Sequence, residues 1–141
     1  MKVKDMMSSP VIQIRPEESV SVASRTLTNY NIGVLPVCDG DRLCGLVTDR
    51  DIVTRCLAAG RDPVSTTVRE IMTGQILAVG PETDAGTAAH LMGRQQVRRL
   101  PVVENGKLCG MLSLGDISHS DENVYDAGDA LTEITNNISN R

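Results

Sequence analysis

The heptapeptide Gly45-Leu46-Val47-Thr48-Asp49-Arg50-Asp51 recurs later in the chain as Gly110-Met111-Leu112-Ser113-Leu114-Gly115-Asp116. Both copies follow a Leu-Pro-Val stretch at the same distance, Leu35-Pro36-Val37 in the first and Leu100-Pro101-Val102 in the second. A shift of 65 residues aligns positions 3–52 with 68–117 without a gap, and about a quarter of the paired positions are identical. The chain is therefore an internal duplication, which predicts two structurally similar repeats.

Each repeat has the pattern of a short helical lead-in followed by strand, helix, strand, strand and helix. In the first copy the lead-in at 3–7 precedes an apolar strand at 11–14, and Pro16-Glu17-Glu18-Ser19 is typical of a helix start. The helix that follows carries Val20, Ala23, Leu27 and Tyr30 near the spacing of one buried face. Strands at 34–38 and 43–48 flank an Asp-Gly-Asp turn and predict a hairpin, and a second helix is expected over about 49–59. The second copy predicts a lead-in at 68–72, strands at 76–79, 100–103 and 108–113, and a shorter second helix.

These patterns divide the chain into a first repeat at 1–60, a linker at 61–67, a second repeat at 68–118 and a tail at 119–141. The tail begins as a polar segment. It then carries an apolar pattern with helical spacing, at Ala127, Ala130, Leu131, Ile134 and Ile138. We expect a C-terminal helix that packs on the module or on a partner chain, and a free amphipathic tail is the alternative.

The composition narrows the classes of partner. Of the 141 residues, 40% are apolar and 23% charged, as in a globular protein, and the net charge is -4. The chain has no Phe or Trp and two tyrosines, Tyr30 and Tyr125, so a ligand ring must rest on aliphatic side chains. A mildly acidic chain without stacking aromatics argues against nucleic-acid binding.

Location and redox state are expected to be those of a cytoplasmic protein. No stretch approaches the roughly 20 apolar residues of a membrane helix, and the start lacks the apolar run of a signal peptide. The four cysteines show no CxxC spacing and no nearby pair of histidines, which disfavours zinc. We expect buried, reduced thiols at Cys38, Cys44, Cys56 and Cys109.

The doubled strand, hairpin and helix pattern with two Gly-x-x-Thr/Ser-x-x-Asp heptads resembles the CBS domain over roughly residues 1–118. A tandem pair of such domains is called a Bateman module, and the chain is similar to the small stand-alone CBS-pair proteins of bacteria. The resemblance implies an α/β (α+β) fold of two tandem β-α-β-β-α repeats related by a pseudo-two-fold axis, with the helical tail outside it. It also implies an adenosyl ligand and a homodimer formed through the helices.

The heptads point to nucleotide chemistry. Thr48 and Asp51, and likewise Ser113 and Asp116, lie three residues apart where a strand passes into a helix. An ionised Asp can accept bonds from both hydroxyls of a ribose, and exposed amides at a helix start favour phosphate. The resemblance gives these four residues the ribose and phosphate roles, and Arg50 lies within the first heptad. The alternative is a capping box, in which the same side chains only satisfy backbone donors.

The resemblance places the adenine base against residues before and along the hairpin strands. These are Ser9, Val11, Ile32, Gly33, Val34 and Pro36 in the first copy, and Gly74, Ile76, Val97, Arg98, Arg99 and Pro101 in the second. The alternative for the aliphatic members is that they are core. Arg98 and Arg99 replace Gly33 and Val34, and two guanidiniums there suit a phosphate, although a solvated edge would also carry them. The pair favours AMP, ADP, ATP or a dinucleotide over a sulfonium ligand among the adenosyl compounds.

The prediction is a regulatory adenine-nucleotide-binding module that needs no cofactor or metal and is not an enzyme. Ser113 does not lie in a nucleophile elbow, and neither His90 nor His119 has a partner at triad or ligand spacing. Asp39-Gly40-Asp41 begins like a calcium loop but lacks the closing Glu, and predicts a turn. Two other classes remain: an interaction scaffold without ligand, and a nucleotide-processing enzyme. A protein partner is expected, and the sequence does not identify it.

Overall fold

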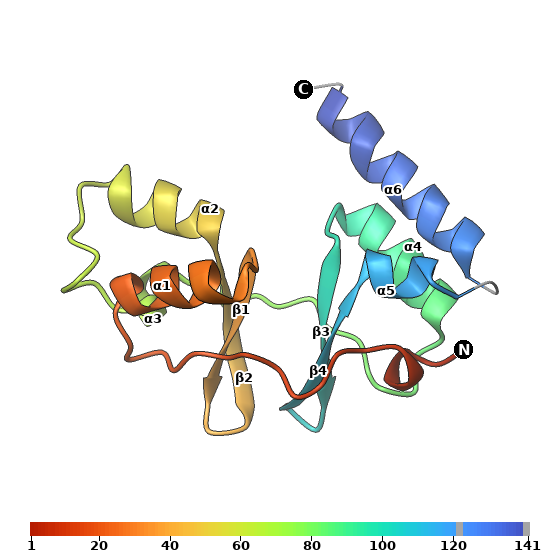
Figure 1. Ribbon diagram of the computed structural model, residues 1–141, viewed down its shortest axis with the longest axis horizontal. Coiled ribbons are helices and arrows are strands. Elements are labelled where there is room, and N and C mark those ends of the chain that lie inside the picture. The colour runs from red at the N-terminus through yellow and green to blue at the C-terminus, as the bar shows by residue number, and fades with distance from the viewer. Residues whose placement is uncertain (121–122, 140–141) are drawn as a thin grey trace. The chain divides into compact units, whose positions relative to one another are not determined.

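The computed structural model describes residues 1–120 and 123–139, including all side chains but those of 137–139. The chain forms two compact units, each built around one β-hairpin (Figure 1). The first-repeat unit comprises Ile12–Ile76, and the second-repeat unit comprises Met1–Val11 together with Leu77–Arg141. Helices accompany the hairpin in both, so the α/β class and the duplication predicted from the sequence are confirmed.

The long helix of each repeat begins and ends at matching positions. Helix α1 spans Val20–Tyr30 and α4 spans Ala85–Gln95. The side chain of Ser19 accepts a bond from the Val22 N–H, and Asp84 accepts two from Gly86 and Thr87, which satisfies donors that a helix start leaves free. Both helices end where the next residue adopts a left-handed conformation.

The buried face of α1 differs from the prediction at one residue. Val20, Ala23 and Leu27 are buried, but Tyr30 is 57% exposed. Tyr30 is the last residue of the helix, and Asn31, with φ 52°, ends the helix directly after it.

The hairpins follow in the predicted places. Strands β1 (Val34–Asp39) and β2 (Arg42–Thr48) pair antiparallel, as do β3 (Arg99–Glu104) and β4 (Lys107–Ser113). Gly40 has φ 65°, and Asn105 and Gly106 have φ 54° and 79°, as tight hairpin turns require. Asp39-Gly40-Asp41 is therefore the predicted turn.

The strands predicted at 11–14 and 76–79 shrink to single residues. Ile14 forms one parallel bridge with Val37, and Val79 forms the equivalent bridge with Val102. The Ile14 and Val79 N–H groups donate to Pro36 and Pro101, and these prolines have no N–H to donate back to the residues before the bridge.

Each second helix starts directly after the hairpin. In the first-repeat unit, α2 (Asp49–Asp51) continues as a π-helix, η2 (Ile52–Leu57). In the second-repeat unit, α5 (Leu114–Ser118) is shorter, as the sequence predicts.

The lead-ins are exchanged between the repeats. The first lead-in, a 3-10 helix at Val3–Asp5 (η1), belongs to the second-repeat unit, where Ser8 and Met111 exchange two backbone hydrogen bonds of 2.9 and 3.1 Å. The second lead-in, α3 (Val68–Ile71), belongs to the first-repeat unit, where Thr73 and Leu46 exchange bonds of 2.9 and 3.0 Å. Each hairpin is therefore completed by the lead-in of the other repeat.

Charged side chains also hold the first lead-in. Lys2 and Lys4 both contact Glu82, at 2.5 and 2.8 Å, and these two hydrogen-bonded ammonium groups lower the pKa of Glu82 to about 2. All three side chains are about half exposed, so salt screens this attachment.

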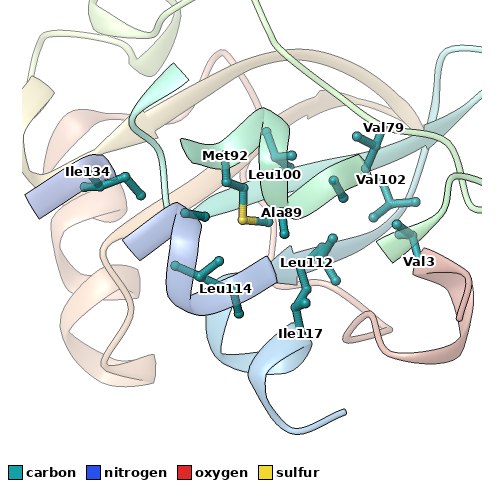
Figure 2. Packing of buried hydrophobic residues seen from close by; sticks show 13 residues of the cluster. Val3, Val79, Ala89, Met92, Leu100, Val102, Leu112, Leu114, Ile117 and Ile134 are labelled. Carbon is teal, nitrogen blue, oxygen red and sulfur yellow. The ribbon is translucent and has the colours of Figure 1, made fainter. Parts of the chain in front are cut away.

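Each unit has its own apolar core. The core of the second-repeat unit gathers side chains from η1, β3, β4, α4, α5 and α6 (Figure 2). In the first-repeat unit it gathers Ile14, α1, β1, β2, η2 and α3. Val3 and Val68, at the start of the two lead-ins, are fully buried, so the exchanged segments are part of each core.

Helix α6 (Val124–Ser139) packs on α4 and α5, which confirms a C-terminal helix that lies on the module (Figure 1). Ala127, Ala130 and Ile134 are buried in the contact, while Leu131 is 43% exposed. A Cβ at Gly93 of α4 would lie 3.0 Å from the Cα of Ala130, so only a glycine permits this approach. The side chain of Ile138 lies outside the described residues.

The four cysteines are free thiols, as expected, but only two are buried. Cys38 and Cys56 are buried, and burial raises the pKa of Cys38 to about 11. Cys44 and Cys109 are half-buried, because they lie where the strand pairing shifts register between Val37 and Cys38 and between Val102 and Val103.

Because the exchanged lead-ins pack so closely on the hairpins, we predict that Gly45 and Gly110 tolerate no side chain. A Cβ at Gly110 would lie 2.7 Å from the Sδ of Met7 and 2.8 Å from the backbone oxygen of Ser8, and one at Gly45 would lie 2.5 Å from the Sδ of Met72. Gly110→Ala and Gly45→Ala should each lower the free energy of unfolding by about 1–3 kcal/mol, measured by urea denaturation. Gly74→Ala is the matched control, because a Cβ there meets no atom within 4 Å. Equal stability of all three variants would contradict the close approach.

Candidate functional site

The heptad side chains form reciprocal caps at both strand-to-helix passages. The Thr48 Oγ1 accepts a 3.0 Å bond from the Asp51 N–H, and the Asp51 Oδ2 accepts a 3.0 Å bond from the Thr48 N–H. Ser113 and Asp116 repeat this arrangement at 3.0 and 2.9 Å. The capping box is therefore present in both repeats. The capping box uses one oxygen of each Asp carboxylate, and the second oxygen takes no part in it.

The second carboxylate oxygen distinguishes the repeats. The Oδ1 of Asp51 lies 3.7 Å from the Nε of Arg55, one helical turn later, and the Asp51 side chain is only 13% exposed. The Arg55 guanidinium also donates to the backbone oxygens of Ile71 and Met72, at 3.1 and 3.3 Å. Ser120 occupies the matching position of the second repeat, so Asp116 has no arginine there.

A backbone bond brings the residues before each hairpin next to the heptad. The Asp49 N–H donates to the Gly33 oxygen at 3.2 Å, and the Leu114 N–H donates to the Arg98 oxygen at 2.8 Å. The first helical residue is thus joined to the residue that precedes the first hairpin strand. In the second repeat this places Arg98 and Arg99 beside Ser113.

A cavity of about 480 Å³ lies at this point of the second-repeat unit. Its walls come from the residues before and at the start of β3, the end of β4, and helices α5 and α6. The lining residues are Arg98, Arg99, Ser113, Leu114, Gly115, Ser118, Val124, Ala127, Gly128 and Leu131. The volume is in the range of about 300–1,000 Å³ that small-molecule sites occupy.

Both arginines are available to a ligand. Arg98 and Arg99 are exposed, and neither forms an ion pair with another residue of the described ranges. With the hydroxyls of Ser113 and Ser118 they give the cavity a cationic, hydrogen-bonding side. Leu114 and the α6 residues give it an aliphatic side.

The other residues predicted for the site are spread over both units. Pro36 and Pro101 are buried, and their carbonyl oxygens accept the bridge bonds from Ile14 and Val79. Ile32 and Val97 are half-buried and pack against the cores, and Val34 is half-buried at the start of β1. Because the lead-ins are exchanged, Ser9 and Val11 belong to the second-repeat unit, and Gly74 and Ile76 to the first. Arg50 is exposed.

The sequence analysis missed the cavity wall that α6 contributes, and it missed Arg55. A signal for the wall was present, since Val124, Ala127, Gly128 and Leu131 follow the spacing of one helical face. The signal for Arg55 was its position four residues after Asp51.

Among residues 1–120 and 123–136, no histidine or acidic residue lines this cavity. His90 on α4 lies 3.2 Å from the Asp126 carboxylate on α6, and His119 is exposed. Within residues 1–120 and 123–139, no three or more His, Cys, Asp and Glu side chains gather where they could hold a metal ion. Over the same ranges, no helix has the length and apolar character needed to cross a membrane.

Comparison with known families agrees with the repeat structure. The CBS domain model matches residues 3–58 and again 68–123. The chain belongs to the CBS-domain family. Each match covers one copy of the repeat, from the lead-in to the helix after the hairpin, so the chain is a tandem CBS pair followed by α6.

Several relatives are similar over most of their length. The CBS domain-containing protein YhcV of Bacillus subtilis is 36% identical over 133 residues, which are 94% of each chain. Hypoxic response protein 1 of Mycobacterium tuberculosis is 36% identical over 116 residues, 82% of this chain and 81% of that one. A crystal structure of Hypoxic Response Protein I with two coordinated zinc ions has a TM-score of 0.78 and 34% identity, over 84% of this CBS pair and 98% of that chain.

A further CBS pair carries adenosyl ligands. The CBS domain pair of protein MJ0100, in complex with 5′-methylthioadenosine and S-adenosyl-L-methionine, has a TM-score of 0.74 and 29% identity. The alignment covers 84% of this chain and 98% of that one.

The caps make a prediction about stability without ligand. Asp116→Ala removes the acceptor of the Ser113 N–H and should cost about 1 kcal/mol, a fall in Tm of roughly 3–5 °C. Asp116→Asn keeps an amide oxygen for that bond and should melt within about 1–2 °C of the wild type. Asp129→Ala, an exposed charge on α6, is the control for lost charge. If Asp116→Ala melts with the control, the cap contributes nothing to folding.

Proposed function

We propose that this CBS pair is a regulatory module that binds an adenine nucleotide, with AMP, ADP or ATP as the ligand class. The observation that supports this most is the cavity of the second-repeat unit, which joins Arg98, Arg99 and Ser113 to an aliphatic wall. The adenosyl ligands of the similar MJ0100 pair support the ligand class. They include a sulfonium compound, whereas two arginines without an ion-pair partner among the described residues suit a phosphate.

The proposed recognition divides the nucleotide among different groups. The guanidiniums of Arg98 and Arg99 pair with phosphate oxygens, since planar arginine donors match that geometry. The free oxygen of Asp116 accepts a ribose hydroxyl while its other oxygen caps the helix. The base lies against aliphatic side chains, because the chain provides no Phe or Trp on which it could stack.

A second, weaker site is proposed for the first-repeat unit. There Thr48 and Asp51 take the ribose role, with Arg50, Ile32, Gly33 and Val34 nearby in sequence. The contact between Asp51 and Arg55 must open or be shared for this to happen, because it lies on the same oxygen. We therefore expect the two sites to differ in affinity, with the second-repeat unit the tighter for phosphorylated ligands.

Regulation is proposed to act through a homodimer or a protein partner in the cytoplasm. Exposed apolar side chains on η2, Val53 and Leu57, at 55% and 54% exposure, give the helices a surface on which a second chain could pack. A ligand that binds one arrangement of the pair better than another shifts the population toward it. Through such a population shift, a module that catalyses no reaction can control a partner protein.

A scaffold that binds no nucleotide is the second candidate. The capping boxes favour it, since they give Thr48, Asp51, Ser113 and Asp116 a structural role in both repeats. The two candidates differ in one measurable respect, which is whether an adenine nucleotide stabilises the folded chain. Binding to the folded state alone adds about 2.7 kcal/mol at 100 times Kd.

The test is the change in phosphate preference when both arginines are removed. Arg98→Ala/Arg99→Ala should weaken AMP by roughly 10- to 150-fold for each sheltered charge-assisted contact, and less where the contact is exposed. Adenosine, which offers no phosphate, should bind the variant and the wild type alike. Isothermal titration at low salt measures both affinities.

Arg25→Ala/Arg94→Ala is the matched control, because it removes two exposed arginines of α1 and α4 that do not line the cavity. This control should keep the wild-type ratio of AMP to adenosine affinity. The same ratio in all three proteins would show that Arg98 and Arg99 are surface charge. Absence of a Tm shift with millimolar AMP, ADP or ATP in the wild type would favour the scaffold.

A further inference from the structure

Helix α6 presents two neighbouring apolar stripes, and only one of them is covered by the protein. The covered stripe packs on α4 and α5 and consists of Ala127, Ala130 and Ile134, each 2–3% exposed. The other stripe faces the cavity and consists of Val124, Ala127, Gly128 and Leu131. Positions i, i+3, i+4 and i+7 lie on one side of a helix, so the Val124, Ala127 and Leu131 side chains and the bare backbone of Gly128 form a continuous strip, with Ala127 shared between the two stripes. Val124 and Leu131 remain 42% and 43% exposed.

The opposite side of the cavity has a different chemistry. It carries the two arginines without ion-pair partners among the described residues, and the hydroxyls of Ser113 and Ser118. The Ser113 oxygen accepts the Asp116 N–H, so its own proton is free to be donated, while the Ser118 hydroxyl donates to the Gly115 oxygen at 2.8 Å. The cavity therefore suits a small anion with an apolar body, whose charge lies at the arginines and whose body covers the strip.

We propose that α6, which lies outside both copies of the repeat, supplies the wall against which the base of a nucleoside monophosphate rests, and that a bound nucleotide fastens α6 to the rest of the second-repeat unit. This inference rests on the proposed function and adds to it the element that recognises the base. The ligand covers Val124 and Leu131, which water otherwise reaches. It contacts α6 on one side and β3 and α5 on the other, so undocking of α6 and loss of the ligand are coupled.

A substitution on α6 can fill the cavity without disturbing the packing of the helix on α4 and α5. A Cβ at Gly128 meets no atom within 4 Å, and a larger residue there also suits a helix better than glycine. Gly128→Leu should therefore place a side chain in the cavity and weaken AMP at least about tenfold, the effect of losing one good apolar contact or more. Thr132→Leu adds the same side chain one turn later, at an exposed position that does not line the cavity, and should bind AMP within about twofold of the wild type.

Leu131→Ala is the complementary variant. It removes part of the wall instead of filling the cavity, and because Leu131 is not in the core it should leave the fold intact while weakening AMP by about 5- to 10-fold. Titration calorimetry on the full chain gives each affinity. Amide hydrogen exchange of α6 without ligand verifies that the helix is docked equally in all four proteins.

Hydrogen exchange with saturating AMP tests the coupling directly. In the wild type, AMP should slow exchange in α6 as well as at the start of β3, and a site that excludes α6 would slow only the latter. Wild-type AMP affinity in both Gly128→Leu and Leu131→Ala, or unchanged exchange in α6 when AMP is bound, overturns the inference and leaves the proposed function in place. Absence of AMP binding to the wild type overturns both.

Discussion

Two glycine positions set the constraint on which the fold depends. At Gly45 and Gly110 the hairpin passes so close to the lead-in of the other repeat that a methionine sulfur and a backbone oxygen occupy the space of any Cβ. The lead-ins are held there by paired backbone bonds and by fully buried Val3 and Val68. Neither repeat can complete its own core, because each lacks the segment that its partner donates. The two repeats are therefore interdependent, because each core includes a lead-in that the other copy supplies.

The reciprocal caps link this scaffold to the candidate site. Each cap fixes the passage from strand to helix with one carboxylate oxygen, and the backbone bond from Leu114 to Arg98 fixes the residue before the hairpin. In the second repeat the cap therefore leaves the other oxygen of Asp116 for the proposed ligand, whereas in the first repeat Arg55 lies against the second oxygen of Asp51. A site built on such a cap is preorganised, since the ligand does not have to order the residues that receive it.

The sequence was sufficient for the duplication, the two long helices, both hairpins and the terminal helix, since these follow from local periodicity, caps and turn residues. Tyr30 was assigned to the core because periodicity continues to the last turn, whereas the left-handed Asn31 ends the helix there. The strands predicted at 11–14 and 76–79 reduce to single bridges, because Pro36 and Pro101 opposite them have no N–H to extend the ladder. The exchange of lead-ins was not predictable, because nothing local distinguishes packing on one hairpin from packing on its homologue. The α6 wall was not predicted for a similar reason: the apolar pattern of the tail indicates a buried helical face, and it does not separate residues of the core from residues that line a cavity.

The two repeats differ at the positions where ligand contacts are expected, and the difference lies in how each repeat uses its arginines. In the first repeat Arg55 lies against Asp51 and joins the helix to the lead-in, so a positive charge is used within the protein. In the second repeat Ser120 replaces that arginine, and two arginines, one directly before β3 and one at its first residue, line a cavity instead. The Arg55 guanidinium is bound to backbone carbonyls, so it stabilises the fold and is not available to a phosphate. Arg98 and Arg99 have no competing partner among the described residues. The addition of α6 then gives the same unit an aliphatic wall. The first repeat thus uses its arginine for internal contacts, whereas the second combines unengaged charge with an aliphatic surface around one cavity.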